Sequence, residues 1–333
     1  MDSILLNTCE NYIKNRNEMR RILRSEGAPM HLMGAACLTA FSRTPDDEKI
    51  LAAENLLKDR EPVDSPIRGA IKSVTTVHMM LAGSMEDYYR DLRRTHDIIK
   101  VHQGTDDERY YMAALMMIDK ISDMPEILQL IDRTSMIHEG MGKSFASVAD
   151  KSSYVAAAYA AACGVRNVRA YIDKVRECES YLRDSGVIKG INEDMCMVLA
   201  LIPEPTKAKC DRAISFYKAI NSLGLNFERP EEATILAFLA GIDMPADEMA
   251  AAVRDADEIS KLHSGFNEGE GIVLRHVYTG MLVTMAYVSD HGVPGLKKVF
   301  MANDEMLKRT VLMESQSVMH IQMSYVDPED LHI

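Results

Sequence analysis

Tryptophan is absent from this chain of 333 residues, and phenylalanine and cysteine are scarce, with seven and six residues. No two cysteines form a Cys-x-x-Cys pair, the spacing typical of metal and redox motifs. Most of the cysteines fall in apolar helical stripes. We therefore interpret them as reduced core residues of a cytoplasmic protein.

Long apolar runs are also missing. No segment reaches about 18 consecutive apolar residues, the length that spans a bilayer. The first residues include Asp2 and Glu10 instead of a basic stretch followed by an apolar one, so no signal peptide is evident. The sequence therefore predicts a soluble, intracellular protein with no membrane partner.

Recognisable catalytic and ligand motifs are lacking as well. There is no Gly-x-Ser-x-Gly elbow, and His138-Glu139 is not followed by a second histidine at helical spacing. The run from Gly140 to Ser144 ends like a phosphate-binding loop, but Ile137 stands where that loop needs glycine. We predict no catalytic residue, no cofactor and no metal site, which favours a non-enzymatic protein and leaves the enzyme question open.

Helical segments recur about every 40 residues, which is the period of HEAT-like helix pairs. No segment alternates with period two for long enough to predict a strand. The first helix of each unit is predicted at residues 30–42, 68–82, 108–121, 151–163, 191–202, 231–241 and 271–289.

Helix ends carry recognisable signals. Thr44 with Asp47 and Ser84 with Asp87 have the spacing of N-terminal caps. Glycine stands where a left-handed C-terminal cap is needed after several of the longer helices, at Gly104, Gly140, Gly186, Gly224 and Gly265.

The two helices of a unit differ in composition. The first is small and apolar, as in Ala156 to Ala162, whereas the second is amphipathic, with Ile172, Val175, Cys178 and Leu182 on one face. A single pair cannot bury its apolar surface, so the pairs must stack. We predict an all-α fold, either an α-solenoid of HEAT-like pairs or a superhelical bundle, with an irregular helical bundle as the alternative.

One domain is predicted over residues 1–325, with about seven helix pairs, and residues 326–333 form a loose tail. Two helices at about 294–302 and 303–325 are expected to cap the array. The second of them carries Met306, Met313, Met319 and Met323, which suits core filling, a docking face or a homodimer seam.

Negative charge is concentrated in one part of the chain. The net charge is −12, and residues 227–271 hold eleven acids against three basic residues. This excess argues against nucleic-acid binding and permits a basic protein partner, and a solvated helix face that keeps the protein soluble is the alternative explanation. The residues predicted to contact a partner are Glu231, Glu232, Asp247, Glu248, Asp255, Asp257, Glu258, Glu268 and Glu270.

Three histidines, His102, His138 and His263, recur near predicted helix C-termini. A cationic imidazole is favoured there by the helix dipole, which accounts for them as capping residues. If the units stack in register, the three would instead form a row along one edge, facing a ligand or peptide.

The residue pattern of the repeated units resembles that of a known group of proteins. Ser153 to Ala158 followed by Tyr181 to Gly186, and Phe216 to Ile220 followed by Leu223-Gly224, are similar to segments of an all-helical domain-of-unknown-function family found mainly in Gram-positive bacteria. This resemblance covers most of the chain. It implies a bacterial cytoplasmic protein and supplies no catalytic residues.

Together these observations favour a non-enzymatic helical-repeat protein that binds a protein or peptide, as a scaffold, adaptor or regulator. The alternative is a binder of a small or lipid-like molecule, or an enzyme, with a pocket lined by methionine and tyrosine between helices. An open groove would favour the first function, and an occupied deep apolar cavity would favour the second.

Overall fold

The computed structural model describes residues 3–24, 28–69, 71–105, 107–118, 124–142, 152–262, 270–288, 311 and 313. Within these ranges the chain is all-helical, with fourteen α-helices, one short 3₁₀-helix, η1 (Pro66–Arg68), and no strand. The predicted all-α class is confirmed.

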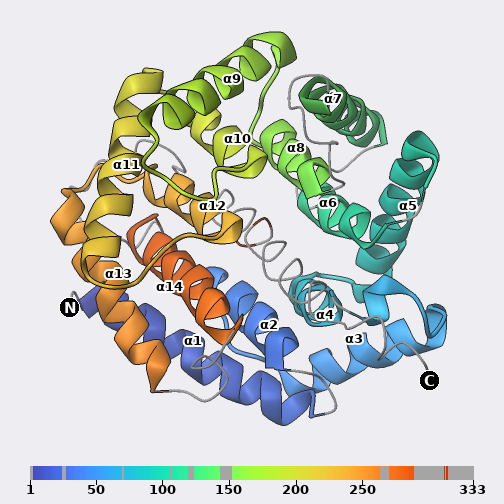
Figure 1. Ribbon diagram of the computed structural model, residues 1–333. Helices are drawn as coiled ribbons and strands as arrows, with labels where there is room; N and C mark the ends of the chain where they lie inside the picture. The colour runs from blue at the N-terminus through green and yellow to red at the C-terminus, as the bar shows by residue number, and fades with distance from the viewer. Residues whose placement is uncertain are drawn as a thin grey trace, which may run out of the picture.

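The helices alternate along the chain between an outer and an inner layer (Figure 1). The outer layer consists of α1 (Ser3–Ile22), α3 (Asp47–Arg60), α5 (Met85–Gln103), α7 (Met124–Gly142), α9 (Val168–Ser185), α11 (Thr206–Ser222) and α13 (Ala246–Lys261). The inner layer consists of α2 (Ala28–Ala40), α4 (Lys72–Leu81), α6 (Glu108–Ile118), α8 (Ser152–Ala162), α10 (Glu193–Leu201), α12 (Pro230–Leu239) and α14 (Glu270–Val288).

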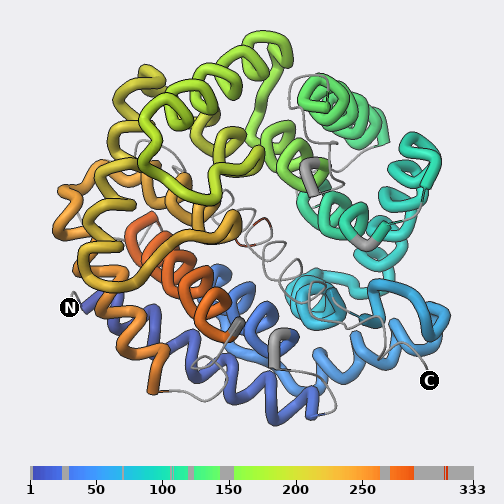
Figure 2. The backbone as a smooth tube through the Cα atoms, viewed as in Figure 1, coloured from blue at the N-terminus to red at the C-terminus, as the bar shows by residue number. Residues whose placement is uncertain are grey.

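The two ends of the helical array meet. Helix α1 packs against α14 and α13 as well as against α2. Figure 2 shows α1 and α14 side by side. In an open solenoid each unit contacts only its neighbours along the chain. The described helices therefore form a closed ring instead of an open stack, because α13 and α14 pack against α1.

The composition of the inner helices explains their position. In α10 the residues Met195 to Ala200 are all buried, and in α8 so are Tyr154 to Ala162. A helix that is apolar on every side has to be enclosed by other helices. All seven segments predicted as first helices of a unit correspond to these inner helices.

The outer helices bury one stripe each. In α9 this stripe is Tyr171, Ile172, Val175, Cys178 and Leu182, close to the predicted one. Outer helices α9, α11 and α13 also pack against one another in turn.

The helix caps agree only in part with the prediction. Ser84 accepts a hydrogen bond from the Asp87 amide at 3.3 Å, as predicted, but α3 is capped by Asp46 instead of Thr44. Left-handed backbone is found at Gly104, Gly186 and Gly224. Gly265 lies outside the described residues.

Gly140 is not a cap, because α7 continues to Gly142. A Cβ atom at Gly140 would stand 2.1 Å from Cδ1 of Ile172 in α9. This glycine therefore allows two outer helices to approach closely.

Buried charges join the last helices of the ring. Glu232 of α12 contacts Nδ1 of His276 in α14 at 2.5 Å, and Asp257 of α13 contacts Nε of Arg275 at 2.6 Å. Lys261 reaches the other oxygen of Asp257 at 2.9 Å. Because each carboxylate has a cationic or hydrogen-bonding partner, these contacts fix α14 against its neighbours.

One stretch, Gly271–Val288, is long and apolar enough to cross a membrane by length and composition alone. It forms most of α14, and 83% of it is buried inside the protein. An inner helix of the ring accounts for this composition. All six cysteines are free, and five of them are buried.

The close contact between α12 and α14 gives a stability prediction. A Cβ atom at Gly280 would lie 2.0 Å from Cγ2 of Ile235, whose β-branched side chain has little rotamer freedom in a helix. Helix propensity alone predicts that Gly280→Ala stabilises the protein by about 1 kcal/mol. We expect a net loss of about 1–2 kcal/mol in urea unfolding, because overpacking outweighs propensity.

Gly83→Ala is the control for this measurement, since a Cβ atom there meets no atom within 4 Å. Its unfolding free energy should stay within about 0.5 kcal/mol of the parent. A stabilised Gly280→Ala variant would show that the two helices are not in this contact.

Candidate functional site

A groove of about 990 Å³ runs along the outer face of α5. Its lining residues are Arg60, Glu86, Tyr89, Arg90, Arg93, Arg94, Asp97, Ile98, Val101, His102 and Met124. Most of them follow one another on α5 at intervals of three or four residues, so they form one face of that helix. From residue 86 to residue 102 this face extends about 24 Å, at 1.5 Å per residue.

The described helices pack mainly on the opposite side of α5 from this face. The opposite stripe, Leu92, Thr95, His96 and Ile99, is buried, and α5 packs mainly on the inner helix α6. The groove therefore lies on the outside of the ring.

The groove is basic in a chain that is acidic overall. Four arginines line it together with only two acids, Glu86 and Asp97. Arg90 pairs with Asp87 at 2.7 Å, and Arg60 lies 3.8 Å from Glu86. Arg94 has no hydrogen bond or ion pair to any described residue, so its guanidinium is available to an incoming anion.

Arg93 is held in place by a buried network at the floor of the groove. Glu61, which follows α3, has a side chain that is 1% exposed and lies 3.3 Å from Nη1 of Arg93. The same carboxylate accepts hydrogen bonds from Tyr89 Oη at 2.6 Å and Ser65 Oγ at 2.7 Å. Arg93 also donates to the hydroxyl of Tyr111 in α6. The network thus connects α3, α5 and α6.

The pKa values of two members of this network, Tyr89 and Arg93, are shifted by their surroundings. Burial, followed by the hydrogen bond to Glu61, raises the pKa of Tyr89 above its ordinary value, so the phenol stays protonated and donates. Burial disfavours the charge on Arg93, but Tyr111, Glu61 and Asp97 outweigh it and raise the pKa of the guanidinium. His96 stacks on the Tyr111 ring, with centroids 3.6 Å apart.

This arrangement suits anion binding. A guanidinium fixed by a buried carboxylate presents its remaining N–H donors in a defined direction, and guanidinium groups bind carboxylates and phosphates with two parallel hydrogen bonds. Exposed apolar surface adjoins these charges, since Val101 is 80% exposed. Among the described residues no group of three or more His, Cys, Asp or Glu side chains could hold a metal ion.

The fold buries two of the acidic residues that the sequence predicted to contact a partner. Glu232 and Asp257 are 2% and 0% exposed and bind His276 and Arg275, so they are structural residues and the prediction that they contact a partner is wrong. They are buried because the two inward faces of α12 and α13 meet α14.

The remaining acids are placed separately. Asp247 and Glu248 are exposed in the first turn of α13, where the helix dipole favours negative charge. Glu258 pairs with Lys261 at 2.8 Å, and Asp255 pairs with Arg254 at 3.1 Å. Glu231 lies half-buried in the first turn of α12, Glu270 begins α14, and Glu268 is outside the described residues.

The histidines do not share one environment. His102 is exposed and lines the groove, whereas the ring of His138 packs on Tyr154 of α8, with centroids 5.4 Å apart. His263 lies outside the described residues. The row predicted for the three side chains is therefore not seen in the two that are described.

Sequence reasoning missed the arginines of α5 and Glu61. The run Arg90-Asp91-Leu92-Arg93-Arg94 within an acidic chain was the available signal for the groove. The local pattern around Glu61 does not indicate burial, because two of the partners of its carboxylate, Tyr89 and Arg93, lie 28 and 32 residues away.

The described residues thus define an all-helical protein with a basic groove on α5. The sequence pattern of a protein family of unknown function, DUF4003, matches residues 15–273. The chain belongs to this family, and the resemblance to an all-helical domain of unknown function is confirmed. Neither the comparison with curated proteins nor the comparison with solved structures found a match.

The floor of the groove gives a second stability prediction. Glu61→Ala removes the acceptor of Tyr89, Ser65 and Arg93 and leaves Arg93 next to uncompensated buried groups. We expect a loss of about 3 kcal/mol in urea unfolding. Arg94→Ala, which removes an exposed side chain without an ion pair, should change the free energy by less than about 0.5 kcal/mol. Equal losses for the two variants would contradict the network.

Proposed function

We propose that this chain is a non-enzymatic binding protein whose α5 groove takes an acidic, amphipathic segment of a protein partner. The carrying observation is the groove itself, which is open, elongated and basic on a chain with a net charge of −12.

The shape of the groove supports a peptide over a compact small molecule. Small-molecule sites enclose most of the ligand surface. The α5 face is instead long and lies on the outside of the ring, and its length of about 24 Å equals that of a sixteen-residue helix. An amphipathic helix laid into a groove is a common mode of peptide recognition.

The chemistry of the lining supports an acidic, amphipathic partner segment. Arg93 and Arg94 can bind carboxylates, while Ile98, Val101 and Met124 offer apolar contacts at one end. Arginine is enriched among the residues that contribute most of the binding energy at protein interfaces. Because Glu61 already holds the side chain of Arg93 in place, less conformational entropy is lost when a partner binds it. Acidic side chains on one helix face with apolar side chains beside them would match this lining.

Binding of model peptides tests the proposal. A fluorescein-labelled sixteen-residue helical peptide of glutamate and leucine should bind the full chain in an anisotropy titration, and its counterpart with lysine in place of glutamate should not. Arg94→Glu should weaken binding of the acidic peptide about tenfold, which is about 1.4 kcal/mol. Raising the salt concentration should weaken it further, because charged contacts are screened.

Arg176→Glu provides the matched control, since Arg176 is 51% exposed on α9 and lies outside the groove. It should leave the peptide affinity unchanged. Equal binding of the two peptides, or equal effects of the two charge reversals, would contradict the proposal.

A photocrosslinking amino acid at Val101 can then capture the natural partner in cells. Val63 is the matched control position, because its side chain is 83% exposed and does not line the groove. A partner captured from position 101 and not from position 63 is expected, and the capture should be lost on adding Arg94→Glu.

A further inference from the structure

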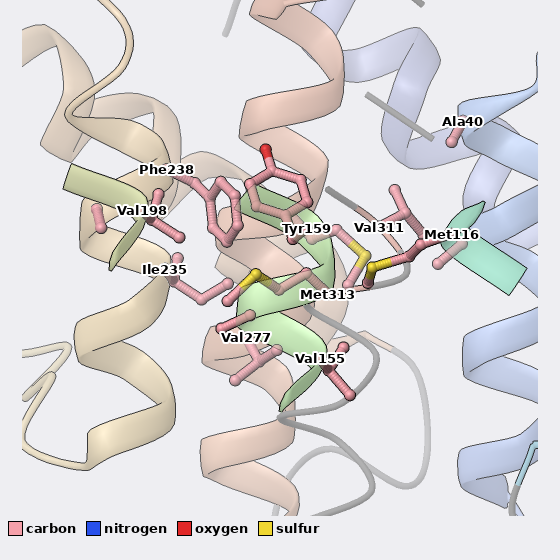
Figure 3. Close-up of a cluster of buried hydrophobic side chains, with 14 of the residues drawn as sticks. Ala40, Met116, Val155, Tyr159, Val198, Ile235, Phe238, Val277, Val311 and Met313 are labelled. Carbon is pink, nitrogen blue, oxygen red and sulfur yellow. The ribbon is translucent and has the colours of Figure 1, made fainter. Parts of the chain in front are cut away.

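The described inner helices form a packed apolar core and leave contacts with a partner to the outside of the ring. Figure 3 shows the buried side chains of Met116 in α6, Tyr159 in α8 and Phe238 in α12 within one cluster. The rings of Tyr159 and Phe238 meet edge to face, with centroids 5.8 Å apart. The surfaces that this chain offers to a second protein therefore lie on the outer helices.

Helix α13 carries an acidic face on the outside of the ring. Its buried stripe includes Met249, Val253 and Ala256, and the helix packs on α11 and α14. The opposite face consists of residues that follow one another at intervals of three or four, namely Glu248, Ala251, Asp255, Glu258 and Leu262. Asp247 lies beside this face in the first turn of the helix.

Most of the acids on this face are available to a partner. The side chains of Asp247 and Glu248 have no hydrogen bond or ion pair to any described residue. The side chain of Glu258 is 63% exposed. Arg254 lies beside the face and pairs with Asp255 at 3.1 Å. The acidic face of α13 therefore presents more negative than positive charge to the outside.

The acidic face of α13 also matches the α5 groove in length and in the position of its apolar end. From residue 247 to residue 262 it extends about 22 Å at 1.5 Å per residue, which is close to the length of the groove. Leu262 is 81% exposed and follows the last residue of α13. Ile98 and Val101 lie near the corresponding end of α5.

A parallel arrangement of the two helices aligns their charges as well. With Leu262 next to Ile98, Glu258 stands at the level of Arg94, because each lies four residues before its apolar neighbour. The guanidinium of Arg94 has no hydrogen bond or ion pair to any described residue. Contacts between a guanidinium and a carboxylate are among the strong hydrogen-bonded pairs in proteins.

We propose that the occupant of the α5 groove is α13 of a second copy of this chain, with Glu258 on Arg94 and Leu262 on Ile98. This inference rests on the proposed function of the groove and names its partner. Complementary charge supports it, because the groove has four arginines against two acids while the exposed face of α13 is acidic.

The positions of the two surfaces determine the kind of assembly. Figure 1 shows α5 and α13 on opposite sides of the ring. A two-fold pair, in which each copy fills the groove of the other, requires the two surfaces to lie next to each other. A contact between surfaces on opposite sides is instead head-to-tail and leaves one groove and one α13 free. Further copies can therefore add to both ends of an open chain.

Sedimentation velocity of the full chain at about 0.15 M salt tests this proposal, since charges more than about 8 Å apart are then largely screened. The sedimentation coefficient of the parent should rise between about 5 and 200 μM, because association depends on protein concentration. Arg94→Glu and Glu258→Arg should each lower the association constant at least about tenfold, because like charges then meet in the contact. Salt at about 1 M should also lower it.

An equimolar mixture of these two variants should associate again, because each variant meets the opposite charge on the other. This recovery also shows that both variants are folded. Glu139→Arg on α7 is the matched control, since α7 is another outer helix with exposed acids, and exposed Met136 lies on it too. It should leave the association of the chain unchanged.

A parent chain that stays monomeric at about 200 μM would overturn the proposal. A mixture of the two variants that stays monomeric would do so as well. The proposal also fails if Arg94→Glu or Glu258→Arg leaves the association unchanged, or if Glu139→Arg weakens it equally.

The anisotropy titration with the acidic helical peptide separates this proposal from the function of the groove. Glu258→Arg leaves the groove intact, so it should bind the peptide as tightly as the parent does, whereas Arg94→Glu should not. Peptide binding by a chain that stays monomeric would leave the function of the groove in place and remove the second copy as its occupant. Absence of both peptide binding and association would remove both proposals.

Discussion

The inner helices are apolar on every side, and their need for neighbours on both faces governs the rest of the structure. Helices such as α8 and α10 cannot face water, so the outer helices cover them from one side and the centre of the ring has to be filled from the other. Closure through α13, α14 and α1 follows from the same requirement, since an open end would leave the faces of α14 and α1 exposed. Methionine suits this interior, because its flexible side chain fills irregular gaps between helices.

Charge is used in two distinct ways around this apolar layer. Where the ring closes, acids are buried and paired, as with Glu232 and His276 or Asp257 and Arg275, and they fix helices in place. On α5 the same type of pairing, between Glu61 and Arg93, fixes one arginine at the floor of an open groove while Arg94 remains available beside it. The first arrangement is structural, and the second supplies the arginines on which the proposed recognition of an anionic partner rests. The net negative charge of the chain makes this basic groove more distinctive, because the rest of the protein surface repels acidic molecules.

The sequence predicted local features well, and it failed where partners are distant along the chain. All seven inner helices were predicted near their observed bounds, because composition and spacing reflect burial directly. Gly140 was misassigned as a cap because a glycine signals either left-handed backbone or close approach, and only the position of Ile172 decides between them. The burial of Asp257 depends on Arg275, eighteen residues away on another helix, and the polar character of Asp257 pointed to the surface instead. Ring closure depends on contacts between the two ends of the chain, for which local periodicity carries no information.

The closed ring is the central claim, and distances between spin labels test it most directly. Nitroxide labels on exposed positions of α1, α7 and α13 can be placed at Glu10, Met136 and Glu258, with the half-buried Cys163 replaced by serine. Pulsed electron resonance then compares the distance from α1 to α13 with the distance from α1 to α7. A closed ring predicts that the distance from α1 to α13 is the shorter one, with a single narrow distribution. A distance from α1 to α13 that exceeds the distance from α1 to α7 would contradict the ring and restore an open helical stack.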